Sequence, residues 1–475
     1  MATEQQSTLS LLERFNGWIQ ESIMIKLFSI GFLSLILLIP ASLIEGLIYE
    51  RQQRADEVMD EVAEKWSGAQ TISGPFLVIP YKRQEVIDLG KEGKEIREYE
   101  QKAFFLPHQL NVKGNIEPQI LQRGIFDAVV YESELQVRSV FSKPDFKTLS
   151  IPEDMVLWNK AYMVFGITDV RGIQDSLTFT AGGSILGSEP SNNIGVSITS
   201  NLTREKGYHA PITSADANNN GITTKLPWTS AEDFSGNVNI ELNLKGSKRL
   251  DFIPAGKTTT VDLAGNWNNP SFDGEFLPDA REVREDGFNA SWKVLHFNRP
   301  FPQQWTEDDQ VLSGADFGVK LLIPVDQYQK STRTAKYGIL IILLTFMALF
   351  LVEITQKIRI HPFQYILIGA ALIIYYTLLL SFSEHVGYNL AYMMSSVATV
   401  ALIGAYSRSF FADAKLSILL TALLVIFYLF IYVIILQQDF SLLIGSVGLF
   451  LIIGTLMYFS RKVKWYSDTR PTQAA

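Results

Sequence analysis

The sequence predicts a membrane α-helical bundle that carries a large β-rich domain, antiparallel and sandwich-like, inserted after the first membrane helix. Of the 475 residues 47% are hydrophobic and only 19% are charged, which is rare for a soluble protein of this length. The long apolar runs are segregated, with one near the N-terminus and five near the C-terminus. The polar segment between them alternates apolar and polar residues, as half-buried strands do.

The apolar runs predict six membrane spans. The first, from about Leu27 to Ile48, has the length of one spanning helix. Its apolar core is too long for a cleaved signal peptide, so we expect a retained signal anchor. The other five runs lie at about 337–354, 363–381, 388–406, 416–436 and 440–459.

The short loops between the later runs predict the orientation, because Lys and Arg are enriched in short cytoplasmic loops. The segments 382–387 and 437–439 contain neither residue. The alternate loops and the tail do contain them, at Lys357, Arg359, Arg408, Lys415, Arg461, Lys462 and Lys464. We therefore expect both termini in the cytoplasm and the large polar segment in the periplasm, in a bacterial inner membrane.

A six-part organisation follows. We expect a cytoplasmic segment 1–26, a first membrane helix 27–48, a stalk helix 49–71, a periplasmic β-rich domain 72–335, five membrane helices 336–460 and a cytoplasmic tail 461–475. The stalk is predicted from apolar residues that recur on one helical face, namely Ile48, Ala55, Val58, Met59, Val62 and Trp66. The β domain is predicted from alternation, as in "NVNIELNLKG" (237–246), and from turn residues between about ten short strands. Its length leaves open whether it forms one or two β units.

Composition and motifs exclude several classes of function. A net charge of -8 without a basic block argues against a nucleic-acid partner. The chain has no Cys, its five His lack metal-ligand spacing, and "HExxH" and GxSxG motifs are absent. No acid or base lies at the middle of a predicted span, which disfavours a transporter. We therefore predict no catalytic residue, no metal and no cofactor.

Several long motifs are similar to those of the CreD family of inner-membrane proteins. They are "ERQQRADEV", "SGPFLVIPY", "FGVKLLIPVDQY" and "WNNPSFDGEFLPDAREVREDGFNASWKVLHFNR". The resemblance covers about residues 25 to 460, with the spans in the same order. It implies a contribution to cell-envelope integrity, expression tied to a two-component regulatory system, and links to colicin tolerance and cell-wall damage. It implies no enzymatic activity and no cofactor.

Glu384 and His385 form the first candidate site, in a predicted short periplasmic hairpin between the third and fourth spans. One interpretation is a hydrated loop. The other is docking, in which Glu384 pairs with Arg333, Lys336 or Arg51 and seats the outer domain on the bundle. A catalytic role would require acids of the outer domain to complete the site.

The second candidate site is an aromatic and acidic stretch that comprises Trp267, Phe272, Asp273, Glu275, Phe276, Phe288 and Trp292. Its aromatic residues are expected in the core of a sheet, with a sugar-stacking platform as the alternative. Its acids resemble the paired carboxylates of glycan-cleaving enzymes, but they flank turn residues and are expected to be solvated. Separately, Asp169 and Arg171 in "TDVRG" are expected to form a structural ion pair.

The predicted function is non-enzymatic. We expect an envelope-integrity factor, conferring tolerance of envelope stress and colicins, whose outer domain binds a wall component, a lipid or a protein partner. One alternative is a membrane-linked enzyme acting on lipid or peptidoglycan intermediates at the outer leaflet. Another is a sensor that couples periplasmic binding to the membrane bundle, although the sequence contains no cytoplasmic domain that would receive the signal.

Overall fold

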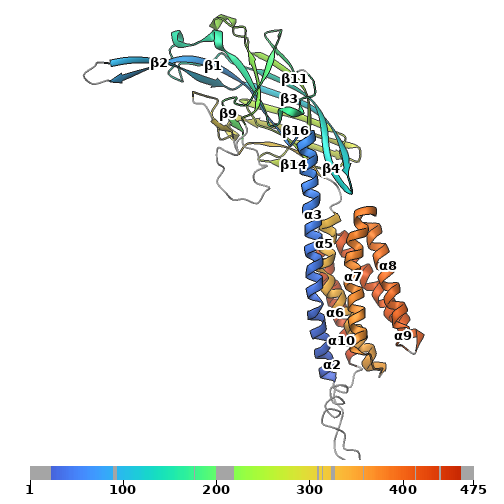
Figure 1. Cartoon of the computed structure of the whole chain (residues 1–475). Helices are drawn as coiled ribbons and strands as arrows, with labels where there is room; N and C mark the ends of the chain where they lie inside the picture. Colours follow the sequence, from blue (N-terminus) through green and yellow to red (C-terminus); the bar gives the residue numbers. More distant parts are fainter. Residues whose placement is uncertain are drawn as a thin grey trace, which may run out of the picture. The chain divides into compact units, whose positions relative to one another are not determined.

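The computed structural model describes residues 23–88, 94–175, 177–198, 219–306, 310–312, 314–322, 327–356, 358–411, 413–437 and 440–461. The predicted N-terminal segment and C-terminal tail therefore lie largely outside the described residues. The chain divides into two compact units, which we describe separately. The helical unit comprises Met1–Ala55 and Val325–Ala475, and the β unit comprises Asp56–Pro324 (Figure 1). Helix α3 (Leu38–Trp66) contributes residues to both.

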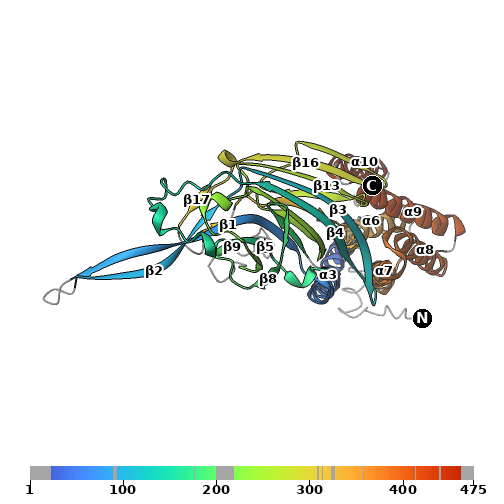
Figure 2. The same ribbon diagram turned by 90° about the horizontal axis from the view of Figure 1, so that it is seen from above.

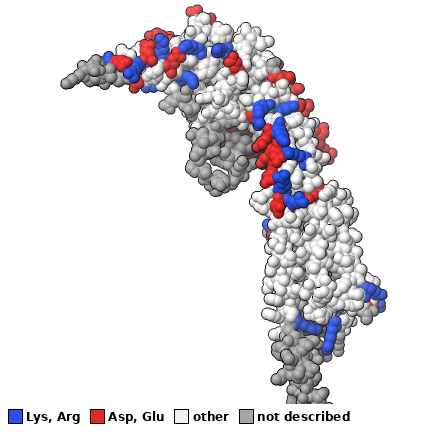
Figure 3. Space-filling model, in the orientation of Figure 1, with Lys and Arg blue, Asp and Glu red and all other residues white. Residues whose placement is uncertain are grey.

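The helical unit is built from apolar helices. Its described elements are α2 (Ile23–Ile36), the first part of α3, α5 (Gln327–Lys336), α6 (Gly338–Gln356), α7 (Pro362–Val386), α8 (Tyr388–Ser407), α9 (Ala414–Leu436) and α10 (Ser441–Ser460). Within the described residues, five helical segments are long and apolar enough to cross a membrane, and a shorter apolar stretch, Leu442–Thr455, lies in α10. The five candidates confirm the membrane character predicted from the sequence, whereas the sixth span stays a prediction. Figure 3 shows a nearly uncharged surface between the two ends of this unit.

The ends of α7 follow from local chemistry. His361 caps its first turn by accepting the Phe363 amide, and Pro362 occupies the first helical position. The helix continues to Val386, and the polar residues of its last turn are part of it. Gly387, with φ of 76°, then reverses the chain directly into α8, a conformation that favours glycine.

This geometry corrects one expectation. Glu384 and His385 do not lie in a hairpin loop; they occupy the last turn of α7. The apolar run ends at 381, but a helix can continue through polar residues. The connection between α7 and α8 is the single residue Gly387.

The β unit contains two large sheets. The first has the path β14 (Pro270–Gly274), β19 (Phe317–Leu321), β12 (Arg249–Phe252), β1 (Gln70–Asp88), β5 (Tyr162–Ile167), β10 (Gly221–Lys225) and β8 (Ser188–Ser191), with β2 (Lys94–Phe105) paired to β1 and β17 (Gln304–Trp305) paired to β2. The second has the order β15 (Ala280–Arg284), β16 (Gly287–Leu295), β13 (Thr258–Gly265), β3 (Gln109–Arg123), β4 (Phe126–Val140), β11 (Asn237–Ser247), β6 (Thr178–Ala181) and β7 (Ser184–Leu186).

The remaining elements of the β unit are short. A two-stranded sheet pairs β18 (Gln310–Leu312) with β9 (Val196–Ile198). Single 3-10 turns occur at η2 (Glu153–Met155), η3 (Trp158–Lys160), η4 (Val170–Gly172), η6 (Ala231–Asp233) and η7 (His296–Asn298). The described residues thus form nineteen strands, more than the ten or so expected from alternation. Most pairs are antiparallel, but β1–β12, β3–β13 and β9–β18 are parallel.

One continuous apolar core joins the two large sheets. It contains Phe76 and Met163 from the first sheet together with Val112, Leu135 and Ile240 from the second, all almost fully buried. This shared core favours a single β unit over two. Beyond it, the distal half of the β1–β2 hairpin is exposed and projects as a two-stranded ribbon (Figure 2).

The last turns of α3 pack within the β unit. Val58 and Ala63 are buried there, while Met59, Val62 and Trp66 are half-buried, so the predicted apolar face is the packed face. Asp60 pairs with Lys248 at 2.6 Å, and Glu61 pairs with Arg123 at 2.6 Å. The stalk is thus the continuation of α3, which ends at Trp66, four residues before β1 begins.

Candidate functional site

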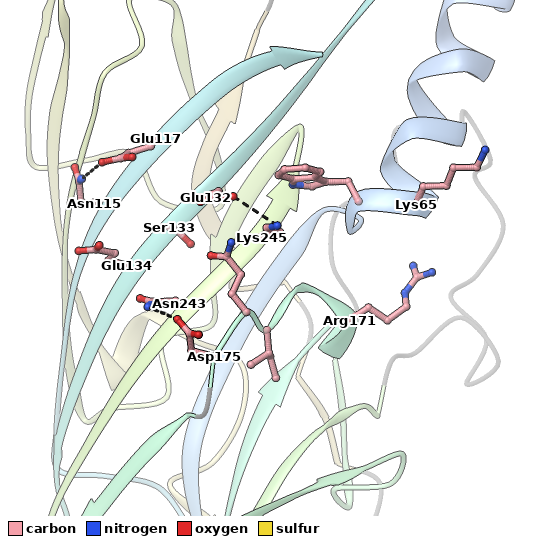
Figure 4. Close-up of a pocket in the computed structure, with 13 residues that line it drawn as sticks. Lys65, Asn115, Glu117, Glu132, Ser133, Glu134, Arg171, Asp175, Asn243 and Lys245 are labelled. Atoms are coloured by element: carbon pink, nitrogen blue, oxygen red, sulfur yellow. Dashed lines mark hydrogen bonds and ion pairs between the residues drawn. The ribbon is translucent and has the colours of Figure 1, made fainter. Parts of the chain in front are cut away.

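A polar groove on the second sheet is the most distinctive site in the β unit. The β-unit groove has a volume of about 740 Å³. It is lined by Lys65, Trp66, Asn115, Glu117, Glu132, Ser133, Glu134, Arg171, Ile173, Gln174, Asp175, Asn243 and Lys245 (Figure 4). All but two of these residues, Trp66 and Ile173, are charged or carry an amide or hydroxyl group.

Strand alternation creates the floor of the β-unit groove, because successive side chains of a strand point to opposite faces. Ile116 of β3, Ser133 of β4 and Leu244 of β11 are buried, at 2% exposure or less. Their sequence neighbours therefore project from the other face. The sequence "NVNIELNLKG" supplies both faces of β11, one to the core and one to the groove.

The strand register arranges the floor in two cross-strand rows. Glu134 lies opposite Asn115 on one side and Asn243 on the other. In the next row, Glu132 lies opposite Glu117 and Lys245. Because directly opposed side chains are about 5 Å apart, each row forms a continuous strip of hydrogen-bonding groups.

The segment that follows β5 forms one wall. The backbone N–H of Gln174 donates to Asn243 O at 3.1 Å, and Ile173 forms an isolated antiparallel β-bridge with Leu244. This segment therefore lies alongside β11. Gly172 permits the close approach, because a Cβ atom there would lie 2.3 Å from Lys245 O. The glycine in "TDVRG" therefore has a packing role.

An ion pair holds the same wall against the end of α3. Arg171 donates to both carboxylate oxygens of Asp169, at 2.9 and 2.7 Å, and to Glu64 O at 2.9 Å. Partial burial opposes ionisation of Asp169, but the hydrogen bonds from Arg171 and from the Gly68 amide outweigh it and hold the pKa of Asp169 at about 2. The predicted Asp169–Arg171 pair is confirmed.

Trp66 closes the groove at the α3 end. Its ring lies 4.3 Å from the Lys245 ammonium, and Lys245 also approaches Glu132 at 3.6 Å. Within the described part of the chain, the indole N–H of Trp66 is buried without a hydrogen-bond acceptor. At this end the groove therefore offers an aromatic ring and the ammonium group of Lys245.

The groups of the groove differ in how far they are engaged. Glu117 accepts from Asn115 and Asp175 accepts from Asn243, at 3.4 and 3.2 Å. Among the described residues, no side chain donates a hydrogen bond to the carboxylate of Glu134. Figure 4 shows carboxylates and amides on one side, with Lys65 and Arg171 on the other. The groove thus offers both donors and acceptors to a polar ligand, and the described residues contain no cluster of three or more metal-binding side chains.

The first predicted candidate group lies in the helical unit. Glu384 Oε1 is 3.7 Å from Arg51 Nε and accepts a hydrogen bond from Tyr328 at 3.1 Å. His385 is exposed, and its ring contacts Ser381 O. Arg333 and Lys336 lie on the neighbouring helix α5. Of the three cations expected near Glu384, Arg51 is the one at ion-pair distance; a role in seating the outer domain stays a prediction.

The second predicted candidate group lies in and beside the core of the β unit. Trp292, Phe288 and Trp267 are at most 9% exposed, and half-buried Phe272 makes edge contacts with both Phe288 and Trp292. Phe276 is likewise partly buried, and its carbonyl accepts the Trp292 indole N–H at 3.1 Å. The packing favours the predicted core role of these rings. It gives no support to the alternative, in which they stack against a sugar, and that alternative stays a prediction.

The acids of this stretch have different surroundings. The side chain of Asp273 is 53% exposed and lies 4.0 Å from Arg249, whose own side chain is 1% exposed. Glu275 lies just after β14, where its amide donates to Asp316 O at 2.9 Å. Sequence reasoning did not anticipate the buried Arg249, whose guanidinium lies 2.6 Å from Asp251 in the same strand.

The residues of the β-unit groove were not among the site residues predicted from the sequence. The signal was present in the polar half of each alternating strand, because Asn243 and Lys245 share a face by period two. Nothing local identifies Glu134 as their neighbour, since β4 and β11 pair across more than a hundred residues, and Asn115 joins them only through the β3–β4 hairpin.

Together, the apolar helices and the β unit with its polar groove define a membrane protein that carries a large ligand-accessible β domain. A family model described as "Inner membrane protein CreD" matches residues 22–466. The Inner membrane protein CreD of Escherichia coli (strain K12) is 30% identical over 444 residues, which is 93% of each chain. The chain belongs to the CreD family, as its motifs suggested.

Proposed function

We propose that this protein is a non-enzymatic envelope-integrity factor of the inner membrane, whose β unit lies in the periplasm and binds cell-wall glycan in the β-unit groove. In this proposal the chain crosses the membrane six times with both termini in the cytoplasm. The two cross-strand rows of amides and carboxylates carry the proposal. Such planar groups match the many hydroxyl and amide groups of a glycan, which need donors and acceptors at close spacing.

The lining distinguishes a glycan from the other expected partners. A lipid chain would require an apolar surface, and the groove has only Trp66 and Ile173 to offer. A stable protein interface is centred on fully desolvated aromatic or aliphatic anchors, which the floor of the groove lacks. The ring of Trp66 in the lining suits the apolar ring face of a sugar.

The surroundings of the carboxylates support binding without catalysis. A glycan-cleaving acid is normally protonated in an apolar pocket before it donates its proton. Glu132 is 43% exposed and lies 3.6 Å from Lys245, so its surroundings are not an apolar pocket. Glu117 accepts a hydrogen bond from Asn115 on an exposed face. These groups suit recognition better than proton donation.

Binding of the full-length protein to isolated cell-wall sacculi tests the proposal. We expect a Glu134→Ala, Asn243→Ala double variant to bind about thirtyfold more weakly, since two hydrogen bonds of about 1 kcal/mol each are lost. The matched control is Asn239→Ala with Glu241→Ala, on the same face of β11 but outside the lining. Equal binding by both double variants would contradict the proposal.

The cellular arm uses a deletion strain challenged with detergents, colicins and wall antibiotics. We expect the wild type and the control double variant to restore tolerance and the groove variant to fail, at equal protein levels. Full tolerance with the groove variant would show that the groove has no part in envelope integrity.

A further inference from the structure

A second groove lies between α8 and α9 in the helical unit. The α8–α9 groove has a volume of about 670 Å³. Met393 and Val397 form one wall and Val425 and Leu429 the other, while Tyr392 and Tyr428 line its buried side. In contrast to the β-unit groove, its surface is almost entirely apolar.

Side-chain size explains why the groove forms. At one end the two helices are in direct contact, since Ser417 donates to Gly404 O at 3.0 Å and a Cβ atom on Gly404 would lie 2.7 Å from Thr421 Oγ1. Small residues permit this close approach. Toward the other end, tyrosines fill the interface, and Tyr392 spans it to donate to Tyr428 O at 2.7 Å. The helices are therefore held further apart there.

The lining has a gradient of polarity along its length. Asn389 lies in the first turn of α8 and Tyr432 in the last turns of α9, whereas Val397, Val400 and Ala401 line the deeper part. From Asn389 to Ala401 the helix rises about 18 Å, more than half of the ~30 Å hydrocarbon core of a bilayer. The groove thus extends from a polar helix end toward the middle of an apolar helix pair.

The groove is continuous with the apolar outer surface of these helices. Leu402, Ile418 and Ile426 beside it are at least 60% exposed. In a membrane protein, such a surface is covered by lipid chains. The volume also discriminates between occupants, because a helix of 10–12 Å diameter over 18 Å would need about 1,400–2,000 Å³. A whole helix from a second copy of the chain therefore cannot be enclosed in this groove.

We propose that the α8–α9 groove binds one acyl chain of a membrane glycerophospholipid, with the headgroup at the Asn389 and Tyr432 end. The amide and the phenol at that end supply donors for the ester or phosphate oxygens. The apolar walls bury the chain, and each buried methylene contributes about 0.8 kcal/mol relative to water. This site is independent of the function proposed for the β unit.

Native mass spectrometry of the full-length protein, released from nanodiscs of phosphatidylethanolamine and phosphatidylglycerol, tests the proposal. We expect one phospholipid to stay bound after extensive delipidation. Val397→Trp fills the groove from α8, and Val425→Trp fills it from α9; each should lower lipid occupancy about tenfold or more. The matched control is Leu402→Trp, an exposed position on α8 outside the lining, which should retain the lipid.

Two results would overturn the proposal. Equal lipid retention by Val397→Trp, Val425→Trp and Leu402→Trp would show that the lipid is only part of the general annulus. A dimer without bound lipid that Val397→Trp abolishes would identify a second copy as the occupant. Size-exclusion profiles and helical circular dichroism of each variant establish folding, and the use of both walls keeps the test decisive if one variant misfolds.

Discussion

Both units of this protein bury charged side chains, but Arg249 in the β unit and Glu353 in the helical unit have partners at very different distances along the chain. In the β unit, Arg249 pairs with Asp251 at 2.6 Å, two residues away in the same strand. In the helical unit, Glu353 pairs with Lys26 at 2.6 Å, across 327 positions, and accepts from Tyr365 at 3.0 Å. The first charge is neutralised locally and stabilises a sheet, whereas the second joins the first helix to later helices.

A second long-range pair reinforces this difference. Glu384 near the end of α7 approaches Arg51 of α3. Within the described residues, the first helical segment thus contacts α6 through Lys26 and α7 through Arg51, at separate points along its length. We infer that the ionic contacts of the helical unit secure its first segment, which is separated from the rest of the unit in sequence by the whole β unit.

Arg249→Met should have the largest effect. Asp251 and Asp316 are at most 1% exposed and Asp273 is nearby, so the substitution leaves buried carboxylates without their cation. We expect a loss of ~3–5 kcal/mol in the stability of the β unit. Pulse proteolysis of the full chain in urea measures it. The control Arg284→Met removes an exposed pair with Glu282 and should cost under ~1 kcal/mol; equal costs would contradict the assigned role.

Glu353→Gln should have the next largest effect. The carboxylate is 3% exposed, and its loss leaves Lys26, 29% exposed, without its anion. We expect a loss of about 2 kcal/mol, because half of the pair stays partly hydrated. Thermal unfolding in nanodiscs measures it, and a double-mutant cycle with Lys26→Met isolates the pair. Glu45→Gln, an exposed acid of the same first segment, is the control. A coupling energy near zero would show that the contact does not hold α2.

Glu384→Gln should cost less. Arg51 is 45% exposed and 3.7 Å away, so the pair is worth under ~1 kcal/mol, with a further contribution from Tyr328. Glu384→Lys places two cations together and should cost more than Glu384→Gln, while His385→Ala should be neutral. The same thermal assay ranks the three. Unchanged envelope tolerance with Glu384→Lys would also remove the hypothesis that Glu384 seats the outer domain.

The contrast between local and long-range contacts also marks what the sequence could predict. The buried face of β11 (Val238, Ile240, Leu242 and Leu244) follows from period two, and the Asp169–Arg171 pair follows from their spacing. Both depend on neighbours within a few residues. The groove floor depends on the register of three strands, and the Lys26–Glu353 pair depends on helix packing. The β4–β11 register and the Lys26–Glu353 pair have no local signal, because non-local pairing is decided by the whole core.

The last prediction is a pH dependence of the β unit. Burial raises the pKa of Asp251 to about 7, against the opposing charge of Arg249. Above its unfolded value near 3.8 the unfolded chain releases a proton that the folded chain retains, so stability should fall as pH rises from about 4 to 7. Asp169, with a pKa of about 2, has the opposite sign, and its contribution is lost only as pH falls below about 4.

These opposite signs separate the two carboxyl groups experimentally. Urea unfolding at intervals between pH 4.5 and 8 samples the Asp251 window alone. Asp251→Asn should flatten the decline in this range, while Asp169→Asn should lower stability without changing the slope. In the wild type the slope should approach one proton within this window, because the folded chain retains the Asp251 proton that the unfolded chain has released. If the free energy of unfolding has the same pH slope in the wild type and in Asp251→Asn, Asp251 does not take up a proton in this range. The Arg249–Asp251 pair would then stay ionised, and it would differ from the Lys26–Glu353 pair only in the sequence distance between the partners.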